Sequence, residues 1–260
     1  MKNKKEIISL SVMILLLIMI NYSFLDKKLE NFLVYDEQEV VERVIDGDTV
    51  IIEGKSTRLL GINTPERGEV YYKEAKEFLE GIVLNKTVFL KFGEEKTDRY
   101  GRNLAYIFLD GENVNLRVVD AGLANFYFPS GKDVYYDDFK SSWESCIEKN
   151  VNLCEKSKNN CGECVVLKNL DYKNDEIILE NICNFDCNLE NWEIKDEGRK
   201  KFIFPKFSLN KKSEVMIIIG NQTNSKNVLY WKDESYVLTK TGDTLFLRDN
   251  EKKLVLWKSY

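Results

Sequence analysis

The first 25 residues have a different hydrophobic pattern from the rest of the chain. A basic start, MKNKK, is followed by Glu6, by an apolar run over residues 7–20 and by a less apolar extension to residue 25. Basic residues before an apolar run are typical of a membrane-inserted leader whose N-terminus stays in the cytoplasm. The lack of a small-x-small cleavage motif favours an uncleaved anchor over a cleaved signal, and a buried core helix is a third interpretation. Both favoured interpretations place the protein outside the cytoplasm, membrane-anchored or secreted.

The middle of the chain alternates between strand and helix periods. Apolar alternation and turn residues predict strands over residues 40–54 (as a hairpin), 57–62, 87–92 and 103–109. Apolar residues at helical spacing predict helices over residues 72–85, 114–121 and 137–149. The pattern therefore predicts a mainly β domain of mixed α+β character.

The last third of the chain contains only short strand patterns separated by turn residues, and no helical period competes with them. This pattern of short strands and turns predicts a β-sandwich of about 100 residues. The whole pattern predicts five segments: a membrane anchor or signal segment (1–25), a polar tether (26–38), a first folded domain (39–157), a linker (158–164) and a β-sandwich domain (165–260).

Composition narrows the possible chemistry. The net charge is −5, whereas a protein that coats DNA by charge alone is expected to be basic. The chain contains no histidine, which excludes a Ser-His-Asp or Cys-His site, histidine-ligated zinc and a histidine base. Catalysis must therefore use carboxylates, Arg, Lys, Tyr, Cys or a metal.

The chain has six cysteines, an even number that predicts disulfides outside the cytoplasm. Cys146 and Cys154 flank the end of a predicted helix and are expected to pair with each other. The other four could pair across two neighbouring loops or together ligate a zinc ion, and we favour disulfides. These four are Cys161, Cys164, Cys183 and Cys187.

Three segments carry residues suited to phosphodiester hydrolysis: residues 44–50 (VIDGDTV), 58–66 (RLLGINTPE) and 97–102 (TDRYGR). A hard cation needs oxygen ligands, and candidates are Asp46, Asp48, Asn63 and the backbone carbonyl of Thr64. Each motif alone has a simpler explanation, since Asp-Gly-Asp is usually a hairpin turn and a single arginine is usually a solvated surface residue. Their order and spacing together are more specific.

The same segments supply the acid–base and charge-stabilising groups of such a reaction. Glu66 can accept a proton from a water molecule. Arg58 and Arg102 can donate forked hydrogen bonds to the charge that grows on the phosphoryl oxygens.

With these motifs in this order, followed by Gly122-Leu-Ala124, residues 40–155 resemble the thermonuclease family, the staphylococcal-nuclease type. The resemblance implies a five-stranded OB-fold barrel with three helices that hydrolyses DNA and RNA with Ca²⁺. It implies that Arg58, Glu66 and Arg102 are the catalytic residues. It also implies that Asp48 is the principal calcium ligand, with Asp46 close by.

One position departs from the family pattern. Asn63 stands where the best-known members have an aspartate, so an oxygen ligand is kept but a negative charge is lost. We expect weaker calcium binding from this change, not loss of activity. Tyr100 and Tyr127 are candidate substrate-binding residues, and stacking on aromatic rings predicts low sequence specificity. For Tyr127, packing within the barrel is an equally good interpretation.

Residues 165–260 resemble the lamin-tail domain, an immunoglobulin-like sandwich, through softer motifs such as Gly242-Asp-Thr-Leu-Phe-Leu-Arg-Asp249. Trp192 is expected in its core. The domain carries no recognisable set of catalytic residues, so we interpret it as a binding or structural module. Its partner is unknown, and a purely structural role is as good an interpretation as binding to a partner.

Two functions follow from the sequence. The first is an extracytoplasmic calcium-dependent nuclease, and the second is a non-catalytic OB-fold module that binds nucleic acid. The presence of Arg58, Glu66, Arg102 and Asp48 together favours the enzyme.

Overall fold

The computed structural model describes residues 4, 10, 12–13, 34–240 and 242–260. The predicted membrane segment and most of the predicted tether therefore lie outside the described residues. Among the residues described, no helix combines the length and apolar character needed to cross a membrane. Strand β1 begins at Glu37, so the end of the predicted tether is part of the first strand. The preceding residues also contact the barrel, because Phe92 N donates to Asp36 Oδ2 at 2.8 Å.

The first folded unit is a closed β-barrel. Its strands lie in the order β3-β2-β1-β5-β6, and a parallel pairing of β3 with β6 closes the ring. This confirms the predicted five-stranded barrel. The bounds are β1 Glu37–Asp46, β2 Thr49–Ile52, β3 Lys55–Leu59, β5 Thr87–Thr97 and β6 Asn103–Leu109, with β7 Glu112–Asn113 added beside β6. We refer to residues 37–154 as the barrel unit.

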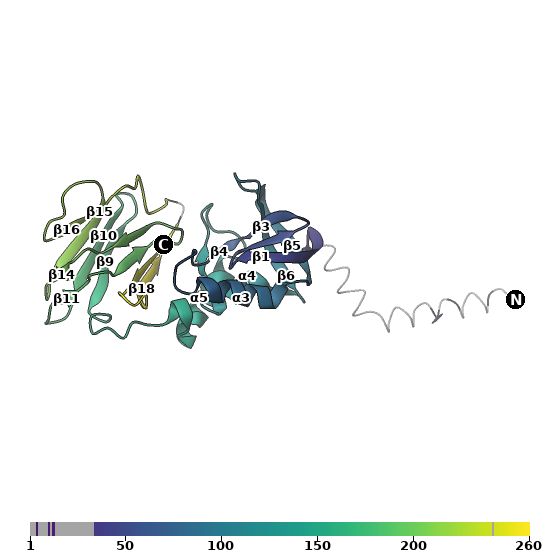
Figure 1. The fold of residues 1–260 in the computed structure, drawn as a ribbon, viewed down its shortest axis with the longest axis horizontal. Helices are drawn as coiled ribbons and strands as arrows, with labels where there is room; N and C mark the ends of the chain where they lie inside the picture. The colour runs from purple at the N-terminus through teal and green to yellow at the C-terminus, as the bar shows by residue number, and fades with distance from the viewer. Residues whose placement is uncertain (1–3, 5–9, 11, 14–33, 241) are drawn as a thin grey trace.

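Three helices lie together beside the barrel strands, as predicted (Figure 1). They are α3 Tyr72–Val83, α4 Val114–Asp120 and α5 Tyr136–Lys149. The buried residues of α3 are spaced by one helical turn, so its apolar face packs on the barrel. Helix α4 begins where the Asn113 side chain accepts hydrogen bonds from the backbone N–H groups of Asn115 and Leu116.

The prediction of a single strand over residues 57–62 is wrong, because the structure has two strands there. Strand β3 ends at Leu59, and Gly61 begins β4 (Gly61–Asn63) with a φ of +74°. This left-handed conformation turns the chain away from β2 and pairs β4 with β8 (Asn125–Tyr127). The turn directs Asn63 and the residues after it away from the hairpin sheet.

Replacing Gly61 with alanine is expected to destabilise the protein by more than about 1 kcal/mol. A Cβ atom at this position would lie 2.8 Å from Cζ of Phe139, and the backbone conformation disfavours any side chain. Urea denaturation would measure the change. Gly81→Ala is the matched control, because a Cβ there meets nothing within 4 Å and Gly81 lies inside helix α3. A helical alanine should leave stability unchanged or raise it, so equal losses in the two variants would contradict the expectation.

Residues 165–260, which we call the C-terminal unit, form further β-sheets around a second hydrophobic core. Trp192 is fully buried in this core, as predicted. The sheet orders are β16-β15-β10-β9, β13-β12-β17-β18 and β11-β14. The bounds are β9 Val165–Asp171, β10 Glu176–Asn181, β11 Cys187–Asn188, β12 Glu193–Lys195, β13 Lys201–Ile203, β14 Ser208–Leu209, β15 Glu214–Ile219, β16 Val228–Trp231, β17 Thr244–Arg248 and β18 Leu254–Ser259.

The two units pack against each other through large side chains. Phe246 of β17 and Leu254 of β18 are buried in the core of the barrel unit. The ring of Phe246 lies 5.2 Å from that of Trp143 in α5, and the ring of Trp257 lies 6.3 Å from that of Phe126 in β8. One sheet of the C-terminal unit therefore covers the α5 and β8 side of the barrel unit.

The predicted disulfides are confirmed. Cys146, at the end of α5, is bonded to Cys154 in a short 3₁₀ helix, η1 (Asn152–Cys154). The remaining four form the pairs Cys161–Cys187 and Cys164–Cys183, with Cα–Cα distances of 5.6 and 5.2 Å. These two bonds tie the segment before β9 to the segment after β10, which are neighbouring strands.

Candidate active site

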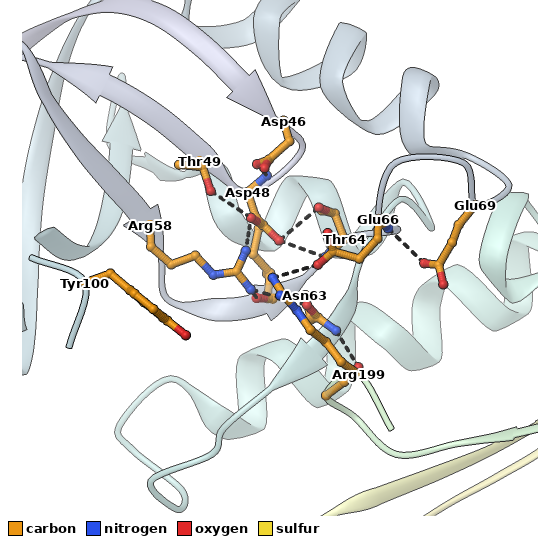
Figure 2. Close-up of polar contacts among 12 residues, drawn as sticks. Asp46, Asp48, Thr49, Arg58, Asn63, Thr64, Glu66, Glu69, Tyr100 and Arg199 are labelled. Atoms are coloured by element: carbon orange, nitrogen blue, oxygen red, sulfur yellow. Dashed lines mark hydrogen bonds and ion pairs between the residues drawn. The ribbon is translucent and has the colours of Figure 1, made fainter. Parts of the chain in front are cut away.

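The turn between β1 and β2 places Asp48 at the centre of the candidate site, beside Arg58 of β3 and the end of β4 (Figure 2). Its carboxylate is buried and forms an ion pair with Arg58. The backbone N–H and the hydroxyl of Thr64 donate to Asp48 Oδ2 at 3.0 and 2.9 Å, and the Thr49 hydroxyl donates to Oδ1 at 3.0 Å. Both carboxylate oxygens of Asp48 therefore have partners. Thr49 at the start of β2 and Thr64 just after β4 together fix the orientation of this side chain.

Arg58 is the most buried cation of the site. Its Nη2 donates to the carbonyl of Ile62 at 3.2 Å and to Oδ1 of Asn63 at 3.3 Å. Burial and then the nearby charge of Arg102 lower the pKa of Arg58 to about 10. The guanidinium remains charged at neutral pH, so it can bind an anion that enters the site.

Glu66 lies on the open side of the site. Its backbone N–H donates to Glu69 Oε2 at 2.8 Å, which fixes the turn after β4. Its side chain is half exposed, and Oε1 lies 2.7 Å from Nη2 of Arg199 in the C-terminal unit. The carboxylate of Glu66 is therefore accessible to water but already has a cationic partner.

Arg102 follows the turn between β5 and β6 and is held by Asp98. Its Nε and Nη2 atoms each lie 2.8 Å from Asp98 Oδ2. The ring of Tyr100, a side chain that is 69% exposed, lies 5.6 Å from the Arg102 guanidinium. Since the charge of Arg102 also acts on Arg58, the β5–β6 turn borders the same site.

Tyr127 in β8 is the second predicted substrate-binding tyrosine, and it is partly buried. A Cβ built on Gly198 of the C-terminal unit would lie 3.5 Å from Cε2 of Tyr127. Burial raises the pKa of Tyr127, so its hydroxyl stays protonated at neutral pH. The structure brings Tyr127 close to the site and places a loop of the C-terminal unit over part of its ring.

The four predicted metal ligands lie together around Asp48. Asp46 Oδ1 accepts a hydrogen bond from the backbone N–H of Asp48 at 3.2 Å, and Thr64 donates from its backbone N–H and its hydroxyl to Asp48 Oδ2. The donors are carboxylate, amide and carbonyl oxygens, which suit a hard cation such as Ca²⁺. Within the described ranges, no group of three or more Asp, Glu or Cys side chains is placed to hold a metal ion. A cation here would therefore depend on two carboxylates together with neutral oxygens and water.

The side chain of Asn63 has a different environment from the one expected of a metal ligand. Oδ1 accepts a hydrogen bond from Arg58, and Nδ2 donates to the carbonyls of Glu197 at 3.2 Å and Gly198 at 2.7 Å. Sequence reasoning missed Glu197, Gly198 and Arg199 altogether. They lie in a short polar loop between β12 and β13, and nothing in that local pattern distinguishes it from an ordinary solvated turn.

Glu197 carries an unusual buried carboxyl group beside the site. Its Oε1 accepts a hydrogen bond from Phe128 N at 2.9 Å, and the group is only 5% exposed. Burial and then the neighbouring Asp243 raise the pKa of Glu197 to about 8. Burial and Asp243 likewise raise the pKa of Asp196 to about 7.

These shifts predict a loss of stability as the pH rises from about 4.5, the ordinary pKa of a glutamate, to about 8. The folded state keeps Glu197 protonated up to about pH 8, whereas the unfolded chain ionises it near the ordinary value of 4.5. A raised folded-state pKa contributes stability that is lost as the pH rises through that window. We expect Glu197→Gln to lose less unfolding free energy over this range than the wild type, by more than about 1.4 kcal/mol.

Urea denaturation at several pH values would measure this difference. Glutamine can still accept the hydrogen bond from Phe128, and the absence of histidine leaves few other groups that titrate in this range. Asp196 still titrates in the variant, so the pH dependence should be reduced and not abolished. Parallel stability curves for the two proteins would contradict the assignment.

Comparison with known proteins agrees with this arrangement. The chain matches the family described as Staphylococcal nuclease homologue over residues 56–156. It is 34% identical to the thermonuclease of Staphylococcus intermedius over 130 residues, which cover 46% of this chain and 77% of that protein. It is 40% identical to the thermonuclease of Staphylococcus hyicus over 104 residues, which cover 35% of this chain and 62% of that protein.

A further relative is the endonuclease YncB of Bacillus subtilis, 31% identical over 131 residues, which cover 45% of this chain and 61% of that protein. The family match ends at residue 156, so the resemblance of residues 165–260 to the lamin-tail domain stays a prediction. The matched segment contains Arg58, Glu66 and Arg102 in their barrel positions. The chain belongs to the staphylococcal nuclease homologue family.

Proposed function

We propose that the chain is a metal-dependent nuclease that hydrolyses phosphodiester bonds of DNA and RNA. The observation that carries the proposal is the largely buried side chain of Arg58, which lies in the field of Arg102 and beside the Asp48 carboxylate. Cations fixed in a partly buried site are suited to the negative charge of a phosphoryl transition state. The names of the relatives, thermonuclease and endonuclease, support the same reaction.

The residues take the roles that their positions allow. Glu66 is solvent-accessible and accepts a proton from the attacking water. Arg58 and Arg102 donate forked hydrogen bonds to the phosphoryl oxygens as charge develops on them. To do so, Arg58 must exchange its pairing with Asp48, and Arg102 its pairing with Asp98, for the phosphate.

Calcium is the proposed cofactor, and the oxygens that would hold it are those of Asp48, Asp46, the Thr64 carbonyl and Asn63 Oδ1, which in the structure accepts a hydrogen bond from Arg58. Such an ion would neutralise and polarise the phosphoryl group. Asp48 can serve as a ligand only by giving up at least one of its present hydrogen bonds or its ion pair with Arg58.

Low base specificity is also part of the proposal. Tyr100 offers an exposed ring beside Arg102, and every base can stack on an aromatic ring. No base-reading residue is needed for cleavage of this kind.

Hydrolysis of fluorescent single-stranded DNA by the full chain across a calcium series tests the proposal. We expect cleavage that needs added calcium and stops when a chelator is added. An absence of cleavage at every calcium concentration would contradict the nuclease function and favour the alternative, a non-catalytic OB-fold module that binds nucleic acid. Cleavage that persists in the chelator would contradict metal dependence but not the nuclease activity.

We further propose that the protein acts outside the cytoplasm, membrane-anchored or secreted. The basic and apolar pattern of residues 1–25 and the three disulfides support this location. Protease treatment of intact cells should degrade an anchored protein, whereas a secreted one is recovered from the medium. Protection inside intact cells would contradict the location.

A further inference from the structure

The loop between β12 and β13, residues 196–200, contacts the candidate active site at several points. The carbonyls of Glu197 and Gly198 accept hydrogen bonds from Nδ2 of Asn63. The Glu197 side chain accepts from the backbone of Phe128, just after β8. Arg199 pairs with Glu66 (Figure 2). One loop of the C-terminal unit thus binds two segments of the barrel unit, the end of β4 with its following turn and the residue after β8.

Contacts on both sides of the loop hold it in this position. Lys201, the first residue of β13, lies 2.5 Å from Oε1 of Glu69, next to the Glu66 turn. Phe246 anchors the adjoining strand β17 in the core of the barrel unit. The loop is therefore docked by its own hydrogen bonds and by the interface around it.

These contacts give a reason for the asparagine at position 63. An amide can donate from Nδ2 to the two loop carbonyls while Oδ1 accepts from Arg58. An aspartate has no donor and would place a negative charge against two carbonyl oxygens. The residue that departs from the family pattern is therefore the one that docks the loop.

Arg199 is placed to act on substrate. Its side chain and that of Glu66 are 67% and 50% exposed, so their ion pair contributes little free energy and exchanges easily. The charge of Arg199 reaches Arg58 and contributes to lowering its pKa, after burial and Arg102. A phosphate group offers Arg199 a bidentate partner of the kind that guanidinium groups prefer.

We propose that the β12–β13 loop is part of the nucleic-acid-binding site and that Arg199 exchanges Glu66 for a backbone phosphate of the substrate. The exchange gives Arg199 a phosphate partner in place of Glu66, so the Glu66 carboxylate is unpaired when a nucleic acid occupies the site. This inference rests on the proposed nuclease function for its substrate class. It assigns to the C-terminal unit a direct part in substrate binding.

The test is binding of a fluorescent single-stranded DNA to the full chain in a chelator, measured by anisotropy over a salt series. Each phosphate contact adds about 0.7 to the slope of log affinity against log salt concentration for a single strand. We expect Arg199→Gln to reduce that slope by about 0.7 and to weaken binding roughly 10-fold. Arg199→Lys keeps the charge and should restore the slope.

Lys226→Gln is the matched control, because it removes one exposed positive charge from the loop before β16. It should leave the slope unchanged. Equal slopes for wild type and Arg199→Gln, or no binding by the wild type, would overturn the inference. Because the assay requires no cleavage, a failure of the nuclease function and a failure of this inference give different results.

Steady-state kinetics provide a second readout. Losing a phosphate contact should raise KM about 10-fold, whereas kcat should stay equal or rise, because Glu66 no longer has a competing partner. A fall in kcat at unchanged KM would contradict the exchange, since it would place Arg199 in the chemical step itself.

Discussion

Replacing Glu66 with glutamine is expected to lower kcat on single-stranded DNA by at least about 100-fold. Glutamine has the same shape and can still accept a hydrogen bond from Arg199, but it cannot take a proton from water. General-base catalysis typically contributes a factor of about 100 to 10,000. The side chain is half exposed, so the substitution should leave the fold intact, and rates under saturating substrate and calcium would measure the loss.

Glu77→Gln is a suitable control for this prediction. Glu77 is an exposed carboxylate on α3 that pairs only loosely with Lys73, at 3.4 Å. Its replacement removes the same charge from a nearby helix and should leave kcat unchanged. Full activity in Glu66→Gln would overturn the role given to Glu66, although not the nuclease activity.

Replacing Phe246 with alanine is expected to destabilise the protein by about 3–5 kcal/mol. Phe246 belongs to a strand of the C-terminal unit, yet it is fully buried against Trp143 and Phe126 in the barrel unit. The cavity would open between the two units, so both the barrel and the docking of the β12–β13 loop should be affected. Urea denaturation with the disulfides kept oxidised would measure the change.

Phe185→Ala gives the comparison for that result. Phe185 has the same side chain but is 47% exposed, so its removal should cost far less. A loss in Phe246→Ala no larger than that in Phe185→Ala would mean that the two units contribute little to each other's stability.

Much of the barrel could be predicted because its signals are local. The strand predicted over residues 103–109 is observed as β6 with the same bounds, since it is a short apolar run and the turn at Asp110-Gly111 marks its end. The helix predicted over residues 114–121 is observed as α4, because Asn113 caps its start and Gly122 follows its end. The break at Gly61 was not predictable in the same way, because a glycine inside a strand pattern can be extended or left-handed.

The central part of the site could also be anticipated, but only through family resemblance. The motifs place Asp48, Arg58 and Thr64 in contact because the barrel closes around them. The contact of Asn63 with Gly198 had no such signal, since 135 residues separate the two. Neither hydrophobic period nor turn chemistry carries information about contacts at that range, so Arg199 could be found only from the structure.

Because Leu254 lies in the core of the barrel unit, this core is completed only after residue 254 has been synthesised. A chain emerging from the ribosome would complete all the barrel strands and helices long before Phe246 and Leu254 appear. Until Phe246 and Leu254 emerge, Trp143 and Phe126 lack the ring contacts that β17 and β18 supply, and the loop that binds Asn63 lacks its neighbouring strand β17. The nascent protein therefore exposes apolar surface and an unfinished site until β17 and β18 have emerged, so folding of the two units is coupled and not sequential.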